Sequence, residues 1–141
     1  LSRMQVFLTQ NGFDVVIGSR YKTGVNVVNW PIQRVLISYF ASWYARIITG
    51  TPIMDLTSGF VGYKAKVLNE ILNNGVKFKG YAFQIEMKFK AYNLKYNLYE
   101  IPIIFTDRVK GSSKLNLSII SEAIFGLITM KISQIFTKIF R

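Results

Sequence analysis

Residues 13–18 constrain the fold more than any other stretch, because they read Phe-Asp-Val-Val-Ile-Gly and lead into a polar, basic loop at residues 19–24. A short apolar run that is rich in β-branched residues predicts a buried strand. In open α/β sheets, the loops at the carboxyl ends of such strands bind ligands. Arg20 and Lys22 in this loop are therefore candidates for binding an anion. The alternative is a solvated, charged surface loop.

The composition narrows the chemistry that the chain can perform. Its 141 residues correspond to one domain or part of one, and they contain no cysteine and no histidine. Disulfides, thiolate zinc sites, cysteine nucleophiles and the commonest general base are thereby excluded. The net charge of +11 indicates a phosphate-rich partner. Because half of the residues are hydrophobic, a membrane suits this charge better than nucleic acid does.

The extent of the chain leads to two further expectations. No run of about 18 uncharged apolar residues occurs, so no clear transmembrane helix is predicted, and there is no signal peptide. The chain also lacks an initiator methionine, and residues 1–4 have the pattern of the middle of a helix. We therefore expect it to be the C-terminal piece of a longer protein.

A helix is predicted to begin at residues 30–31, where a proline suits the first turn. A polar stripe follows one side of it, opposite a broad apolar face, and no acid occurs between residues 18 and 46. Arg34 and Ser38 lie one turn apart and both donate hydrogen bonds, so together they could bind one phosphate. A solvated stripe is the alternative. The stripe consists of Arg34, Ser38, Ser42 and Arg46.

Two further segments carry polar groups suited to a ligand. Residues 55–60, Asp-Leu-Thr-Ser-Gly-Phe, combine a carboxylate, two hydroxyls and a glycine in one loop. Such side chains also tie down turns by bonding nearby backbone amides, which is the alternative for this loop. Residues 82–94 predict a helix that carries Gln84 and Glu86 near its start. A glutamate there often serves only as a partner of the helix dipole.

The rest of the chain predicts a strand at residues 60–63, a helix at 64–73 and a strand at 96–105. Residues 106–114 form a second basic loop, which could close over a phosphate as a lid or remain disordered. Residues 117–140 predict a helix with a broad apolar arc and cations in its second half. This pattern is typical of a helix at a membrane interface, and packing against another part of the protein is the alternative.

Taken in order, six motifs resemble those of the dolichol-phosphate mannose synthases, which belong to the GT-A glycosyltransferases that load a sugar onto a polyprenyl phosphate. The resemblance extends from about residue 14 to residue 114, and it depends on the register of the whole set, since each motif alone is weak. The motifs are Asp14-Val-Val-Ile-Gly-Ser-Arg20-Tyr21, Asn29-Trp-Pro-x-x-Arg34, Asp55-Leu-Thr-Ser-Gly-Phe60, Gly80-Tyr-Ala-Phe-Gln-Ile-Glu86, Ile101-Pro102 and Asp107-Arg108-x-x-Gly111-x-Ser113-Lys114.

The resemblance implies an α/β fold: residues 1–116 would be the C-terminal half of a Rossmann-like GT-A domain, and residues 117–141 an amphipathic helix at the membrane interface. In the family, the N-terminal half binds the nucleotide and carries an Asp-x-Asp motif that holds Mg²⁺ or Mn²⁺. This chain has no Asp-x-Asp. We therefore expect the metal ligands to lie outside it and the fragment alone to be inactive.

The chemistry implied by the resemblance suits a protein without histidine. The acceptor is a phosphate monoester whose oxygen attacks the anomeric carbon of the sugar with inversion, so that no general base is needed. The protein supplies cations that hold the acceptor phosphate and stabilise the departing diphosphate. The expected catalytic residues are Arg20, Arg34 and Asp55, and the expected substrate-binding residues are Ser38, Ser58, Gly59, Gln84, Glu86, Arg108 and Lys114.

The expected partners are a nucleotide-sugar donor, a polyprenyl or dolichyl phosphate and the cytoplasmic face of a membrane. The wording of the motifs favours mannose from GDP-mannose, with a UDP-sugar of the glucose type as the alternative. A basic membrane-binding module without catalysis is the alternative from another class. No nucleic-acid partner is expected, because the cations are dispersed and no single element combines them with stacking aromatic residues.

Overall fold

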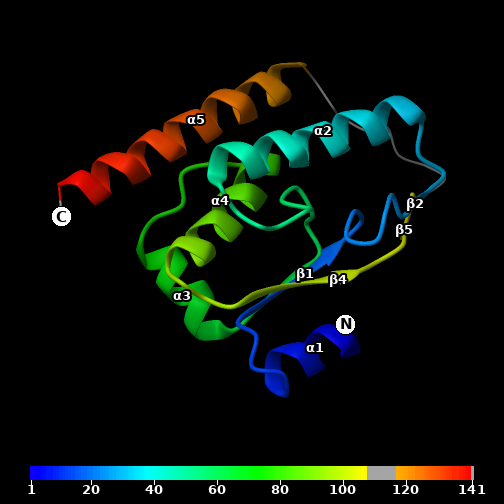
Figure 1. Cartoon of the computed structure of the whole chain (residues 1–141), viewed down its shortest axis with the longest axis horizontal. Helices are drawn as coiled ribbons and strands as arrows, with labels where there is room; N and C mark the ends of the chain where they lie inside the picture. Colours follow the sequence, from blue (N-terminus) through cyan, green and yellow to red (C-terminus); the bar gives the residue numbers. More distant parts are fainter. Residues whose placement is uncertain (108–116, 141) are drawn as a thin grey trace.

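The computed structural model describes residues 1–107 and 117–140 as a mixed α/β structure (Figure 1). Its described part contains a three-stranded sheet, a two-stranded sheet and five helices. The α/β class predicted from the sequence is thus confirmed at this level. The helices are α1 (Ser2–Thr9), α2 (Ile32–Thr49), α3 (Ala65–Asn73), α4 (Gly80–Asn93) and α5 (Leu117–Ile139).

The central strand β1 (Val15–Ser19) organises the larger sheet. It pairs in parallel with β4 (Leu98–Pro102) and antiparallel with β3 (Val61–Tyr63), and all five of its residues are buried. This confirms the buried strand that the β-branched run predicts. Because β1 and β4 are parallel, their carboxyl ends meet at one edge of the sheet, where the chain continues into the predicted anion-binding loop.

The second sheet joins β2 (Val27–Val28) to β5 (Phe105–Thr106) in parallel. The sequence did not predict β2, and it predicted the β5 residue Phe105 only as the end of a longer strand. Two-residue strands are too short to show any periodicity, so local pattern cannot find them. This pairing brings the loop that follows β1 next to the segment that precedes residue 108.

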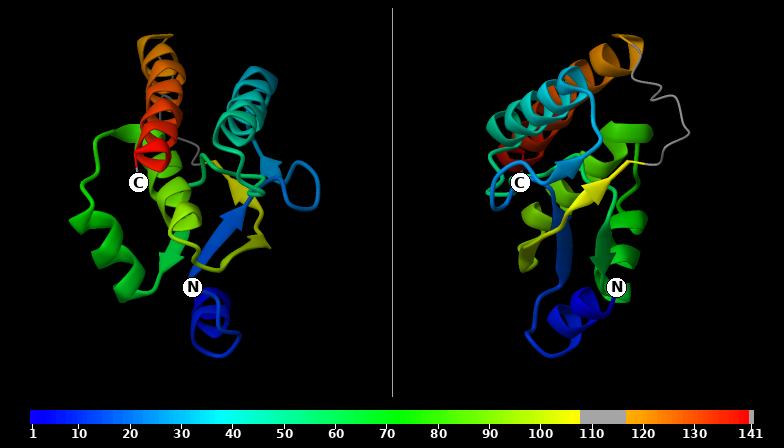
Figure 2. Two further views of the ribbon diagram at one scale, coloured as in Figure 1. Left: turned by 60° about the vertical axis from the view of Figure 1, so that its left-hand side comes forward. Right: turned by 90° about the vertical axis from the view of Figure 1, so that its right-hand side faces the viewer.

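The helices lie on both faces of the larger sheet (Figures 1 and 2). Val15 and Ile17 of β1 contribute to a core shared with α2, α3, α4 and α5, whereas Val16 faces Met4 of α1. This is the alternation of side chains that a pleated strand imposes. α2 follows Pro31 and ends at Gly50, whose φ of 69° is the left-handed conformation that favours glycine at helix ends.

Helix α5 packs on α4 and α2 by one face, through the buried residues Leu127 and Met130. Its packing is close, since a Cβ at Gly126 would lie 2.7 Å from the ring of Phe78. The other sides of the helix are exposed. By length and composition, Ser118–Ile139 could cross a membrane, with a mean hydropathy of 1.5. The sequence-based search for an uncharged run missed this segment, because lysine and glutamate interrupt it.

Candidate functional site

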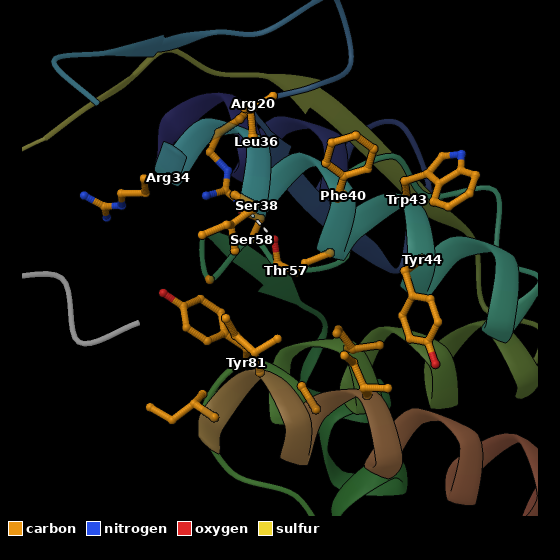
Figure 3. A pocket seen from close by; sticks show the side chains of 18 of the residues that line it. Arg20, Arg34, Leu36, Ser38, Phe40, Trp43, Tyr44, Thr57, Ser58 and Tyr81 are labelled. Carbon is orange, nitrogen blue, oxygen red and sulfur yellow. Dashed lines mark hydrogen bonds between the residues drawn. The ribbon is translucent and has the colours of Figure 1, made fainter. Parts of the chain in front are cut away.

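A cavity of about 880 Å³ lies between α2 and α5 and extends to the loop at residues 57–60 and the start of α4. We call it the α2–α5 cavity. One end of it is polar and the remainder is apolar (Figure 3). The polar side chains at one end of its wall are Arg20, Arg34, Ser38, Thr57, Ser58 and the hydroxyl-bearing Tyr81. The apolar ones include Leu36, Ile37, Phe40, Trp43, Ile85, Ile120, Ile124 and Leu127, and Tyr44 lies beside Trp43.

Arg20 and Asp55 form a buried ion pair at the polar end. Nε and the backbone amide of Arg20 donate to Oδ2 of Asp55 at 2.7 and 2.9 Å, and Nη2 donates to Oδ1 at 2.7 Å. Nη2 also donates to the hydroxyl of Thr57 at 2.8 Å. Burial alone would lower the pKa of Arg20, but the hydrogen bonds and charge of Asp55 outweigh burial and raise it. Nε and Nη2 of the Arg20 guanidinium thus have hydrogen-bond partners, whereas Nη1 has none among the described residues.

The loop that carries Asp55 is fixed by further buried bonds. Glu100 of β4 accepts hydrogen bonds from the backbone amides of Met54 and Asp55 at 2.9–3.0 Å. The hydroxyl of Ser58 donates to the carbonyl of Gly18 at 2.6 Å, which joins the loop to the end of β1. These bonds include the turn-stabilising kind that the sequence left open as an alternative. Ser58 also lines the cavity, together with Thr57 and Gly59, whereas Asp55 lies behind this wall.

Lys88 of α4 supports this loop from behind. Its side chain is fully buried, and its ammonium donates to the carbonyls of Leu56, Ser58 and Gln84 at 2.8, 2.6 and 3.2 Å. Burial lowers its pKa to about 7, although Asp55 and Glu100 act in the opposite direction. No salt bridge joins Lys88 to a carboxylate in the described part of the chain, so backbone carbonyls are its hydrogen-bond partners.

Arg34 reaches the polar end from α2 and is held less tightly. Its guanidinium lies 4.0 Å from the ring centroid of Trp30 and pairs with Asp107, with about a fifth of the side chain exposed. The other predicted phosphate ligand on α2, Ser38, accepts a hydrogen bond from the hydroxyl of Tyr21 at 2.7 Å. The ring of Trp30 also lies 5.3 Å from the Arg20 guanidinium, so one indole contacts both cations.

The predicted substrate-binding residues divide into three groups. Ser38, Ser58 and Gly59 line the cavity, and Gln84 lies beside it, with its Nε2 3.8 Å from the position of a Cβ at Gly59. Glu86 does not line the cavity. Its buried carboxylate accepts from the amides of residues 77 and 78 at 2.9–3.1 Å and pairs with a lysine one turn on. Arg108 and Lys114 lie outside the described residues, so their roles remain predictions.

Several residues at the site were not predicted as functional. Lys88 was missed because α4 is buried on almost every side, so a lysine in it stands out only once burial is known. Its position between the buried apolar residues Met87 and Phe89 is the one signal that the sequence offers. Trp30 and Tyr81 line the cavity, but an aromatic residue by itself carries no signal of function.

The described residues contain no group of three or more histidine, cysteine or acidic side chains that could hold a metal ion. The buried carboxylates Asp55, Glu86 and Glu100 are each engaged by protein donors. The described part of the chain thus does not fit a divalent-metal centre. That the ligands of Mg²⁺ or Mn²⁺ lie outside the chain remains a prediction.

Chemically, the site combines two guanidinium groups, hydroxyls and an apolar sleeve, which suits an amphiphile with an anionic head. Comparison with known proteins shows that the chain is related to the polyprenyl-phosphate mannose synthases. It is 43% identical to the polyprenol monophosphomannose synthase of Mycolicibacterium smegmatis and 40% identical to the undecaprenyl-phosphate mannosyltransferase of Micrococcus luteus. Each match covers 114 residues, or 81% of this chain.

The chain spans less than half the length of these relatives, 43% and 47% respectively. No model of a known protein family matches it. The identities to these two relatives nevertheless confirm the resemblance drawn from the motifs as homology to polyprenyl-phosphate mannose synthases.

Proposed function

We propose that the protein to which this chain belongs transfers mannose from GDP-mannose to a polyprenyl phosphate, and that this chain binds the acceptor. The observation that carries the proposal is the α2–α5 cavity. Its polar end holds Arg20, Arg34 and Ser38, and its remaining wall is apolar. A lipid phosphate has the same division into a doubly charged head and a long apolar chain.

The head group is assigned to the polar end because the donors are found there. Arg20, Arg34 and Ser38 all line this end of the cavity; in Figure 3 Arg20 and Ser38 lie close together, and the Arg34 side chain extends to one side of them. Arginine binds phosphate oxygens in a bidentate manner, with stronger bonds than neutral donors make. Asp107, now paired with Arg34, would share or yield that cation when a phosphate binds.

The lipid chain is assigned to the space between α2 and α5. Both helices expose large apolar side chains beside the cavity, which is rare on a soluble surface of this size. We place this surface at the cytoplasmic face of a membrane, where a lipid could enter the cavity without crossing water. The exposed residues are Ile32, Leu36, Ile37, Tyr39, Phe40, Trp43 and Ile47 of α2 and Ile124, Phe125, Ile128, Ile132, Ile135, Phe136 and Ile139 of α5.

In the proposed reaction, an oxygen of the acceptor phosphate forms a bond to the anomeric carbon of mannose. The bond from that carbon to the nucleoside diphosphate breaks, and the diphosphate leaves with the electron pair. The phosphate is already anionic near neutral pH and needs no base, which matches a site without histidine. Arg20 and Arg34 orient the phosphate through fixed positive charge.

The same proposal assigns residues 1–116 to the C-terminal half of a Rossmann-like GT-A domain, with residues 117–141 as its membrane-interface helix. Support comes from the mixed α/β sheet, the homology and the share of the relatives that the chain covers. The nucleotide and its Mg²⁺ or Mn²⁺ would bind to the other half. This chain alone would then bind the acceptor without completing the transfer.

The test is transfer of radiolabelled mannose from GDP-mannose to undecaprenyl phosphate by the full-length protein, with lipid-extractable label as the readout. We expect label in the lipid fraction, and much less when Ser38→Ala removes one donor. UDP-glucose in place of GDP-mannose should give little product. A preference for UDP-glucose would overturn the choice of sugar.

A second measurement separates catalysis from simple binding. Tight binding to anionic vesicles, with no transfer from any nucleotide sugar, would support the membrane-binding module instead. Tight binding to oligonucleotides without preference for vesicles would contradict both readings.

A further inference from the structure

The loop at residues 55–59 presents its backbone to two sides. Its carbonyls at Leu56 and Ser58 point to the Lys88 ammonium, at 2.8 and 2.6 Å. A further carbonyl one turn back in α4, that of Gln84, completes the set at 3.2 Å. Two alternate peptide groups of the loop therefore have the same orientation relative to one buried cation.

Peptide geometry then fixes where the amides point. The chain contains no cis peptide bond, and in a planar trans peptide the N–H lies opposite the C=O. The amides of Thr57 and Gly59 belong to the peptide groups whose carbonyls bind Lys88, so both N–H bonds point away from it. Thr57, Ser58 and Gly59 line the α2–α5 cavity, whereas Lys88 does not.

Neither amide is used elsewhere in the part of the chain that the structure describes. Its hydrogen bonds include the Ser58 amide to the Asp55 carbonyl and the Phe60 amide to the Ser58 hydroxyl, but none from the amides of Thr57 or Gly59. Backbone amides are obligatory donors, and Thr57 is buried, so its amide lacks a partner away from water; Gly59 is exposed, so its amide is open to a ligand. Two unpaired donors beside two guanidinium groups are suited to an anion.

We propose that the amides of Thr57 and Gly59 form an oxyanion-binding pair in the wall of the cavity, with Lys88 as the positioning residue behind it. The ligand is a phosphate group, and its identity as the acceptor phosphate rests on the proposed function. Backbone amides that line one concave surface bind anions in this way, and separate oxygens of the phosphate would meet the two amides. The nearby guanidinium groups of Arg20 and Arg34 supply the net charge.

Lys88 contributes in two ways. It holds both carbonyls in place, which fixes the direction of the amides before the ligand arrives. Its ammonium also withdraws electron density from the same peptide groups, and linked hydrogen bonds strengthen one another. Lys88 does not touch the ligand in this arrangement, because it lies on the far side of the loop.

Nuclear magnetic resonance of the full-length protein in detergent tests the amide pair directly. The protein is labelled with ¹⁵N at glycine and threonine and titrated with farnesyl phosphate, with farnesol as the uncharged control. We expect the Gly59 and Thr57 amide protons to move downfield with the phosphate only, and to show scalar coupling to ³¹P. Phosphate binding that leaves both amides unmoved would overturn the proposal.

The role of Lys88 is tested by Lys88→Met, which keeps the length of the side chain and removes the cation. Lys66→Met, on the exposed surface of α3, removes the same charge as a matched control. We expect farnesyl phosphate to bind roughly tenfold to a hundredfold more weakly to Lys88→Met, the range for losing the hydrogen bonds of the two amides to a charged group, and farnesol to bind equally well. Loss of both ligands would indicate a collapsed loop and would contradict the positioning role.

The two proposals fail in different ways. If mannose transfer proceeds normally while neither amide responds to phosphate, the proposed function stands and the oxyanion pair is wrong. If farnesyl phosphate shifts both amides but no nucleotide sugar supports transfer, the pair stands and the proposed function is wrong.

Discussion

Arg20 and Arg34 bring their charges to the same end of the α2–α5 cavity, but the protein holds them in different ways. Arg20 is buried and makes four hydrogen bonds to Asp55 and Thr57, counting its backbone amide. Arg34 is partly exposed and pairs with Asp107 at the edge of the described structure. The first pair joins the end of β1 to the loop at residues 55–59, whereas the second joins two surface elements.

This difference gives the two arginines different roles, one in the stability of the site and the other in binding a ligand. A buried ion pair that is broken on one side leaves an uncompensated charge in the interior, which is costly. An exposed pair contributes little to stability, since water and salt screen it. Arg20 thus belongs to the framework of the cavity and offers one nitrogen to a ligand, while Arg34 can change partners.

The largest expected effect is therefore at the buried pair. Asp55→Asn should lower the free energy of unfolding by about 3–5 kcal/mol, because Arg20 keeps its charge and loses its partner. Urea unfolding monitored by circular dichroism measures this. In a double-mutant cycle, Arg20→Met should restore part of the loss. If Asp55→Asn is as stable as the parent, the pair is not part of the framework, and our comparison of the two arginines fails.

The Arg20–Asp55 pair also shows which features of the fold and the site could be predicted from the sequence. The strand at β1 and the bounds of α2 were predictable, because β-branched residues, Pro31 and Gly50 act locally. The polar types in residues 55–60 were singled out from the sequence as well. Their bond to Arg20 spans 35 positions, and no local pattern contains that information. The motif order of a known family assigned Arg20 and Asp55 to one site, but it did not predict that they bind each other.

Glu86 and Lys88 show the same limit. They lie two positions apart on α4, and the resemblance assigned Glu86 to substrate binding, whereas Lys88 was not singled out. The structure places the Glu86 carboxylate on the backbone at residues 77 and 78, away from the cavity wall. Lys88 supports the loop at residues 55–59, although charge on a helix usually indicates a solvated face. Burial decides both roles, and burial depends on how the helices assemble.

A second prediction extends the comparison to Lys88, a buried cation paired with carbonyls. Its pKa is lowered from 10.5 to about 7 by burial, with Arg20 acting in the same direction and Asp55 and Glu100 opposing. Between these pH values the unfolded chain binds a proton that the folded chain does not. The free energy of unfolding should therefore rise with pH there, by at most about 1.4 kcal/mol per unit. Below about pH 7 both states are protonated, and Lys88 adds no slope.

Urea unfolding from about pH 6 to pH 9 measures this dependence. Lys88→Met should remove the rise between pH 7 and 9, whereas Lys66→Met, which changes an exposed lysine, should keep it. Equal slopes in the parent and Lys88→Met would mean that the folded state keeps Lys88 protonated throughout, so that its carbonyl bonds outweigh its burial.

The smallest expected effect on stability is at Arg34, where a small loss of stability should accompany a large loss of activity. Arg34→Ala should lower the free energy of unfolding by no more than about 1 kcal/mol, since its ion pair with Asp107 is partly exposed. Mannose transfer by the full-length protein should fall far more, by about a hundredfold or beyond, because a charged donor to the phosphate is lost. Arg34→Lys tests the shape of the donor: it keeps the charge but loses the planar fork and should recover little activity. If the melting temperature and the activity fall in parallel across these variants, Arg34 belongs to the framework of the cavity, as Arg20 does. Activity that falls while the melting temperature holds would show that one end of the cavity contains both a fixed cation and an exchangeable one.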